Sequence, residues 1–151
     1  MNRCSWCNLK NQKYVDYHDN EWCVLNMDER YLYEMFILES FQAGLSWECV
    51  LNKREAFLKA YDNFDIDKVV KYDDVKIEEL RNNKDIIRNR LKIQASINNS
   101  KIYMNIVNEF GSFYNYLSHF SGGRIFYEIG KTTSALSDKI SFDLRCRGMK
   151  F

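Results

Sequence analysis

Glu39 stands where the residues around it predict an apolar side chain. Leu32, Met35 and Phe36 recur at the spacing of one helix face, and Glu39 takes the next position of that repeat, seven residues after Leu32. An unpaired carboxylate is costly to bury, so Glu39 must turn to solvent, pair with a cation or line a cavity. The spacing alone leaves a solvated or paired structural role and a functional role both open.

Five aromatic residues and two metal-ligand types surround this acid in the sequence. Cys4 and Cys7 form a Cys-x-x-Cys pair, and His18 follows within the same N-terminal segment. A structural zinc site needs four such ligands, and no downstream Cys/His pair at ligand spacing completes it, so a buried thiol pair with a hydrogen-bonded histidine is the alternative. The aromatic residues can serve either as core or as the walls of a binding pocket: Trp6, Tyr14, Tyr17, Trp22 and Trp47.

Basic residues cluster after an acidic stretch. Arg88, Arg90 and Lys92 lie in a polar connection and at the start of a long predicted helix, whereas residues 62–79 are acidic. A helix N-terminus with basic side chains beside it can bind a DNA phosphate, and a solvated helix face is the alternative. The whole chain has a formal net charge of +1, so composition argues neither for nor against nucleic acid.

Helical spacing positions these residues through most of the chain. The stretch 38–47 reads Leu-Glu-Ser-Phe-Gln-Ala-Gly-Leu-Ser-Trp and predicts a helix that ends near Gly44, after which Ser46 caps the next helix. The N-terminal segment from Cys4 to Trp22 is poor in helical periodicity, and the segment that ends at Lys131 is ambiguous between strand and loop. The expected helical segments are 29–42, 47–61, a turn through 69–70, another turn that ends near 80, and a long helix over 90–110. A further helix starts at 112, runs through 116 and 117 and is broken by the turn at 121–123, and a last one opens at 133 or 134 and closes before 148.

The composition bounds the class of protein. The 151 residues contain no proline, no repeat and no evident linker, which predicts a single all-α domain over residues 1–151. Five cysteines, an odd number, and the absence of an apolar signal segment or a long apolar run indicate a reducing cytoplasm and no membrane. We expect a monomer.

Ordered blocks of residues resemble the DNA-3-methyladenine glycosylase I family. The resemblance covers nearly the whole chain, and its blocks follow one another without change of order. They are Cys4-x-Trp6, Tyr14-x-x-Tyr17-His18-Asp19-Asn20-Glu21-Trp22, Leu38-Glu39-x-x-Gln42-Ala43-Gly44-Leu45-Ser46-Trp47, Ile86-Ile87-Arg88-x-Arg90-x-Lys92-Ile93 and Ser137-Asp138-x-x-Ser141-x-x-Leu144 with Arg147-Gly148-x-Lys150-Phe151.

The resemblance implies a fold, an activity and a role for each matching residue. The expected fold is a single-domain helical bundle of the helix-hairpin-helix DNA glycosylase type, which flips 3-methyladenine out of double-stranded DNA and excises it hydrolytically in base-excision repair. The implied roles are hydrogen bonds from Glu39 and Tyr17 to the base, stacking by Trp47, pocket walls from Trp6, Tyr14 and Trp22, backbone contacts from Arg88, Arg90 and Lys92, and zinc ligation by Cys4 and His18.

The resemblance also implies a final helix and two further zinc ligands after the position of Phe151, which the 151 residues do not include. The structural zinc is therefore expected to be incomplete or lost. An inactive homologue that binds DNA or a protein partner without excision stays open as the alternative function, because the pocket residues alone do not establish turnover.

Overall fold

The structure, a computed structural model, describes residues 3–127 and 131–151. Within these ranges the chain forms helices and no strand, which confirms the predicted all-α class. The elements are α1 (Gln12–Asn20), α2 (Glu29–Gln42), α3 (Trp47–Leu51), α4 (Arg54–Ala60), the 3-10 turn η1 (Asp62–Phe64), α5 (Ile66–Val69), α6 (Asp74–Asn82), α7 (Arg90–Phe110), α8 (Phe113–Ser121) and α9 (Ala135–Cys146).

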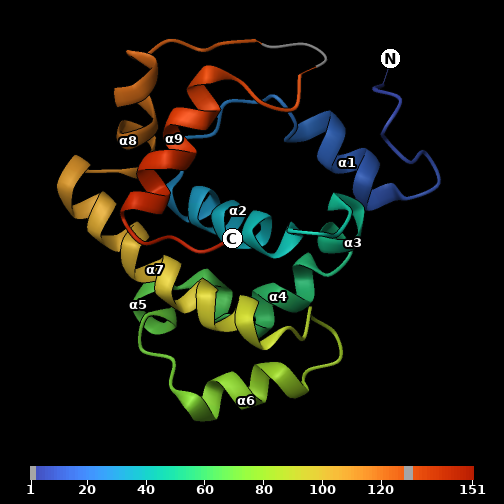
Figure 1. Cartoon of the computed structure of the whole chain (residues 1–151). Coiled ribbons are helices and arrows are strands. Elements are labelled where there is room, and N and C mark those ends of the chain that lie inside the picture. The colour runs from blue at the N-terminus through green and yellow to red at the C-terminus, as the bar shows by residue number, and fades with distance from the viewer. Residues whose placement is uncertain (1–2, 128–130) are drawn as a thin grey trace.

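Helices α2 and α7 form the centre of the molecule. In Figure 1, α2 crosses the middle of the view, with α6 at one end of the molecule and α8 and α9 at the other. Ile37, Leu38 and Phe41 of α2 are completely buried, and so are Ile93 and Ile106 of α7. This shared core fixes α2 at the point where the candidate site residues meet.

Buried hydroxyl groups between the central helices are paired. The hydroxyl of Tyr33 on α2 lies 2.6 Å from Ser100 Oγ on α7, and the hydroxyl of Tyr61 lies 3.0 Å from Ser96 Oγ. Because a buried polar group is costly without a partner, these pairs fix the register of α7 against its neighbours.

Side-chain caps begin the helices where the sequence predicts them. Asp28 accepts from the backbone N–H of Tyr31 at the start of α2, and Asn89 accepts from that of Lys92 at the start of α7. Gly111 ends α7 in the left-handed conformation, with φ +82°. The predicted helices 29–42 and 90–110 are confirmed with these bounds.

The structure differs in two places from the local structure that the sequence indicates. The expected helix 47–61 is interrupted at Asn52 and Lys53, so α3 and α4 are separate helices. The N-terminal segment, although poor in helical periodicity, contains α1, which has only Tyr14 and Tyr17 buried and no side-chain cap. Its two buried positions are three residues apart, and within nine residues they make too short a repeat to mark a helix in the sequence. Of the ambiguous segment, residues 124–127 form neither helix nor strand, and residues 128–130 lie outside the described ranges.

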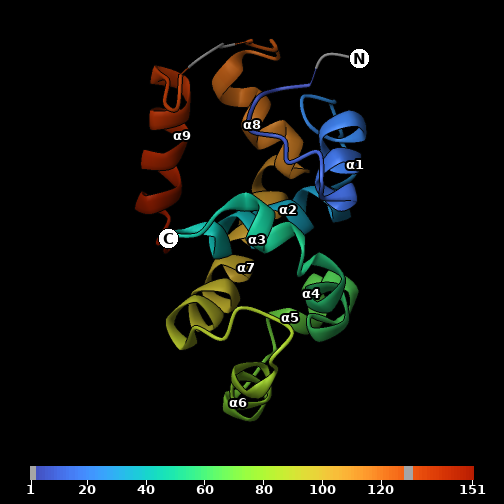
Figure 2. The same ribbon diagram turned by 90° about the vertical axis from the view of Figure 1, so that its right-hand side faces the viewer.

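Helix α9 lies at the periphery. Figure 2 shows it on the side of the molecule away from α1, and among the helices it packs mainly on α8. None of its twelve residues, all of which the structure describes, is buried. Across the described part of the chain, no helix combines the length and the apolarity that crossing a membrane requires.

Candidate functional site

Glu39 lines two cavities beside α2. Their volumes are about 420 and 430 Å³, and both are also lined by Leu32, Met35 and Ile140. The repeat that predicted a core face is therefore the wall of a cavity. Among the described residues, no hydrogen-bond donor or cation contacts the Glu39 carboxylate, so its functional role is favoured over pairing.

The surroundings of Glu39 disfavour its charged form. The residue is accessible to solvent, yet protein atoms around the cavities remove much of the water from its carboxylate. This desolvation raises the pKa of Glu39 above its ordinary 4.5. A cationic ligand in the cavity would favour the charged carboxylate and reverse that cost.

Tyr17 of α1 faces the same cavity as Glu39. Its side chain is buried and its hydroxyl, like the Glu39 carboxylate, belongs to a residue that lines the 420 Å³ cavity. Burial raises the pKa of Tyr17 to about 12, and the negative charge of Glu39 contributes to the same shift. The hydroxyl thus stays protonated at neutral pH and is available as a hydrogen-bond donor.

Trp47, at the start of α3, packs against Tyr17 with ring centroids 5.4 Å apart. Its indole Nε1 is buried and has no hydrogen-bond partner among the described residues, although it lies close enough to the Tyr17 hydroxyl to influence the pKa of that group. Trp47 does not itself line either cavity. A buried N–H without a partner is unusual, and a ligand acceptor would satisfy it.

Trp6, Tyr14 and Trp22 form an aromatic cluster beside Tyr17. The ring of Trp6 lies 5.3 Å from that of Tyr14 and 5.2 Å from that of Trp22, and the Trp22 ring lies 6.4 Å from that of Tyr17. None of the three lines the two cavities. The structure thus brings Tyr17 and Glu39 into one cavity and places the other predicted aromatic residues behind or beside Tyr17.

The opposite walls of the cavities come from residues that the sequence analysis did not assign to a site. Helix α8 contributes Tyr114 and Leu117, and α9 contributes Leu136 and Ile140. In α9, Leu136 and Ile140 stand four residues apart, the spacing of one helix face, but this spacing gave no indication of a cavity. Periodicity marks an apolar face and does not distinguish a core contact from a cavity wall.

An ion-pair cluster supports the site from the side of α4. Arg54 Nε lies 2.6 Å from Glu34 Oε1 on α2, and its Nη1 lies 2.8 Å from Glu21 Oε1, just after α1. The guanidinium also lies over the ring of Tyr31, which lines the cavity, at 5.9 Å from the ring centroid. Arg54 therefore joins the helices that carry Tyr17 and Glu39.

The predicted backbone-binding residues divide into two groups. Arg88 and Arg90 are exposed where the 83–89 turn enters α7, and Lys53 Nζ donates to Asp85 O at 3.0 Å to hold that turn. Lys92 is only 8% exposed, and its ammonium donates to Phe41 O at 2.8 Å and to Ala43 O at 2.5 Å. The prediction that Lys92 contacts DNA is corrected, because its charged end is turned inward to α2.

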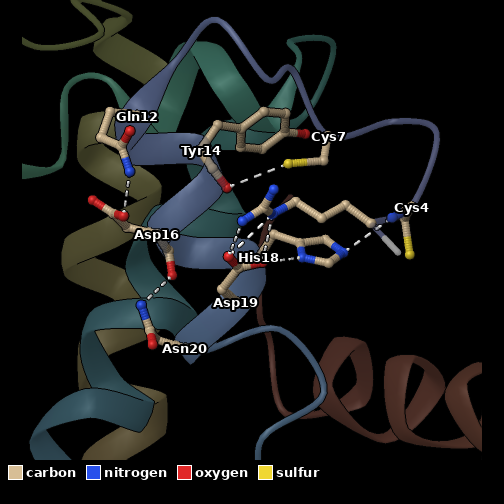
Figure 3. A network of polar contacts seen from close by, with 9 residues as sticks. Cys4, Cys7, Gln12, Tyr14, Asp16, His18, Asp19 and Asn20 are labelled. Carbon is tan, nitrogen blue, oxygen red and sulfur yellow. Dashed lines mark hydrogen bonds and ion pairs between the residues drawn. The ribbon is translucent and has the colours of Figure 1, made fainter. Parts of the chain in front are cut away.

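Cys4 and His18 lie next to each other in the N-terminal segment, as Figure 3 shows. The backbone N–H of Cys4 donates to His18 Nε2 at 3.2 Å, and His18 Nδ1 lies 2.9 Å from Asp19 Oδ1. Asp19 is in turn held by the Arg3 side chain, 2.6 Å from Arg3 Nη2. With the imidazole proton on Nδ1, this nitrogen donates to Asp19 Oδ1 and Nε2 accepts from the Cys4 N–H.

Among residues 3–127 and 131–151, no three His, Cys, Asp or Glu side chains are arranged to hold a metal ion. Cys7, the other candidate thiol, is buried with its Sγ 3.8 Å from Tyr14 O. The described residues therefore do not make up a complete zinc site, and zinc ligation by Cys4 and His18 stays a prediction.

Comparisons with known proteins agree with these features. The family model described as methyladenine glycosylase matches residues 6–151. The chain is 40% identical over 158 residues to DNA-3-methyladenine glycosylase 1 of Escherichia coli (strain K12), across 100% of this chain and 83% of that protein.

Solved structures share the fold. A crystal structure of 3-methyladenine DNA glycosylase I matches with a TM-score of 0.92 and 35% identity, covering 99% of this chain and 85% of that one. A crystal structure of a variant of 3-methyladenine DNA glycosylase I in complex with 3-methyladenine matches with a TM-score of 0.90 and 31% identity, covering 99% and 83% of the two chains.

Proposed function

The chain belongs to the methyladenine glycosylase family, and on this basis we propose that it is a DNA glycosylase that excises 3-methyladenine from alkylated DNA in base-excision repair. The observation that carries the proposal is the unpaired carboxylate of Glu39 in a cavity that it shares with Tyr17. An enzyme that acts on a base within a duplex must first take the base out of the stack, and it needs such a cavity to receive it.

The residues of the cavity suit a cationic purine. A 3-methylated adenine in DNA is positively charged, so the carboxylate of Glu39 attracts it. Trp47 does not line the cavity in this structure, so stacking on its face, with a cation–π contribution of about 1 kcal/mol, requires this ring to become part of the cavity wall when the base enters. Tyr17 supplies a protonated hydroxyl as a donor at the same cavity. Trp6, Tyr14 and Trp22 pack together beside Tyr17 and so support the position of its ring.

The reaction requires little acid catalysis. The leaving base already carries positive charge, so the bond to the sugar breaks without prior protonation by the enzyme. Glu39 and Tyr17 hold the departing base, water attacks the sugar carbon, and positioning with electrostatic stabilisation lowers the barrier. No additional catalytic aspartate is invoked.

We further propose that α6, the 83–89 turn and α7 act as the helix-hairpin-helix that holds the backbone of double-stranded DNA, with the protein as a monomer. Arg88 and Arg90 are exposed at this turn, and the first N–H groups of α7, a 21-residue helix, are near them. Phosphate contacts of this kind make binding fall steeply with salt concentration. The five free thiols favour a reducing compartment.

The decisive experiment is release of 3-methyladenine from methylated duplex DNA by the purified chain, with its zinc content measured on the same sample. We expect release by the wild type and strong loss in Glu39→Gln, with Glu34→Gln as the matched control on the same helix. Salt-sensitive DNA binding without base release would instead establish the alternative, a homologue that binds without excision. Near-normal release by Glu39→Gln would refute the role given to this carboxylate.

A further inference from the structure

Lys92 occupies an unusual place for a basic residue. It is the third residue of α7, where its positive charge is unfavourable for the dipole of its own helix, and its side chain is only 8% exposed. The described residues give its ammonium no carboxylate partner and two backbone carbonyls, Phe41 O at 2.8 Å and Ala43 O at 2.5 Å. Both carbonyls belong to the C-terminal end of α2, where a positive charge is favourable.

These contacts hold the start of the link between the two helices that carry Glu39 and Trp47. The link consists of residues 43–46, all exposed to solvent, and Gly44 within it has φ +74°. The Gln42 carbonyl accepts from the Leu45 N–H at 2.6 Å, so Lys92 supplies the donors for the carbonyls on either side. The Lys92 ammonium is therefore the side-chain donor for the Phe41 and Ala43 carbonyls at the end of α2.

Lys92 joins two parts of the molecule. Its backbone N–H donates to Asn89 Oδ1 at 3.1 Å in the cap of α7, next to the exposed Arg88 and Arg90. Its ammonium, in contrast, lies at the end of α2. Lys92 therefore connects the start of α7 with the segment that leads into Trp47.

We propose that Lys92 is a positioning residue that fixes Trp47 relative to Glu39 and couples the base cavity to the start of α7. The kinetic part of this inference rests on the proposed function, whereas the structural part does not. A phosphate-contact role would require the ammonium to leave both carbonyls and reach solvent.

The test compares Lys92→Met and Lys92→Arg with Lys101→Met, which removes an exposed lysine from the same helix. We expect Lys92→Met to lower kcat for base release about tenfold, because a small displacement of a positioning group is costly to the reaction. Its KM and the salt dependence of DNA binding should match the wild type, since no phosphate contact is lost. Lys92→Arg should recover part of kcat because it keeps a charged donor, and Lys101→Met should change none of these quantities.

A second measurement isolates Trp47. The chain contains three tryptophans, so Trp6→Phe with Trp22→Phe leaves Trp47 as the only one, and excitation beyond the absorption of tyrosine selects its emission. In that background, Lys92→Met should shift the emission of Trp47 to the red and increase its quenching by acrylamide, without DNA or substrate. If Lys92→Met does not fold, Lys92→Arg is measured in its place, with a smaller shift in the same direction.

The outcomes separate the two proposals. If the wild type releases no base, the proposed function fails, and the Trp47 emission alone decides the inference. Unchanged emission overturns the inference, and so does an unchanged kcat with a salt slope lower by about one, which would make Lys92 a phosphate contact.

Discussion

Two regions of α2 each carry a glutamate, and the two glutamates have opposite surroundings. Glu34, in the N-terminal half, pairs with Arg54 at 2.6 Å, and that arginine also binds Glu21. Glu39, five residues later, lines two cavities without a partner among the described residues, and its pKa is raised. The first acid joins helices and stabilises the fold, whereas the second is left for a ligand at a cost to stability.

The largest expected effect is on excision activity, which should depend on Glu39 and not on Glu34. Glu39→Gln should lower excision of 3-methyladenine about 100-fold, because the variant loses the charge that holds the cationic base. Glu34→Gln should retain most of the excision activity, since this residue faces Arg54 and not the cavity lining near Glu39. Base release from methylated duplex DNA measures the activity of both variants. Equal losses in the two would contradict the distinction between a functional Glu39 and a structural Glu34.

The next largest expected effect is on the free energy of unfolding, to which the ion pairs of Arg54 with Glu34 and Glu21 should contribute. Arg54→Met should lower the free energy of unfolding by about 2 kcal/mol, because it leaves two partly buried carboxylates without their partner. Arg54→Lys should lose less, since one ammonium keeps the charge but cannot reproduce both contacts. Urea unfolding measures these values. A wild-type stability in Arg54→Met would show that the ion-pair cluster does not hold the helices together.

The pH dependence should run in opposite directions for stability and activity around Glu39. The folded state holds the Glu39 proton at pH values where the unfolded chain has released it, so the stability from this group is present at low pH. It is lost as the pH rises from about 4.5 through the raised pKa. The measurement is the free energy of unfolding of the wild type and of Glu39→Gln across that pH range. The wild type should lose stability with rising pH, and Glu39→Gln should not show this loss.

Excision should show the reverse trend, because it requires the charged carboxylate. We expect kcat/KM of the wild type to fall as the pH drops through the raised pKa of Glu39. A profile that is flat across this range, with the protein folded throughout, would contradict the role of the carboxylate.

The smallest effect concerns the hydroxyl of Tyr17. Tyr17→Phe keeps the packing against Trp47 and removes one donor, so excision should fall about fivefold, the effect of one hydrogen bond. Tyr14→Phe is the matched control, since Tyr14 is also buried on α1 but does not line the cavity. An equal loss in both variants would indicate a packing effect and not a contact with the base.

Local chemistry made part of this arrangement predictable. Asp28 and Ser46 place the starts of α2 and α3 because their side chains satisfy backbone N–H groups within three residues. Glu39 was identified because an acid broke an apolar repeat, and the aromatic residues were identified through the resemblance to a family. These signals are all carried by neighbouring residues in the chain.

Features that depend on distant segments were not predictable in this way. The sequence shows Lys92 as one of three basic residues near a turn, but only the packing of α7 on α2 turns it inward. The cavity walls on α8 and α9 likewise arise from tertiary contacts, because Leu136 and Ile140 have the same periodicity as core residues. Apolar spacing specifies a face, and the fold decides what that face meets.

The exposed packing of α9 has a consequence for amide hydrogen exchange. This helix buries none of its twelve residues completely. Its partly buried Ile140 and Leu144 pack against the core, Tyr116 bonds Asp143 at 2.9 Å, and Arg147, just after the helix, pairs with Glu109 at 2.6 Å. Its amides should therefore exchange through a local opening that leaves α2 and α7 protected. Because Leu136 and Ile140 of α9 line the cavity, a base bound there would slow this exchange, and deuterium uptake in α9 would report cavity occupancy without any chemical step.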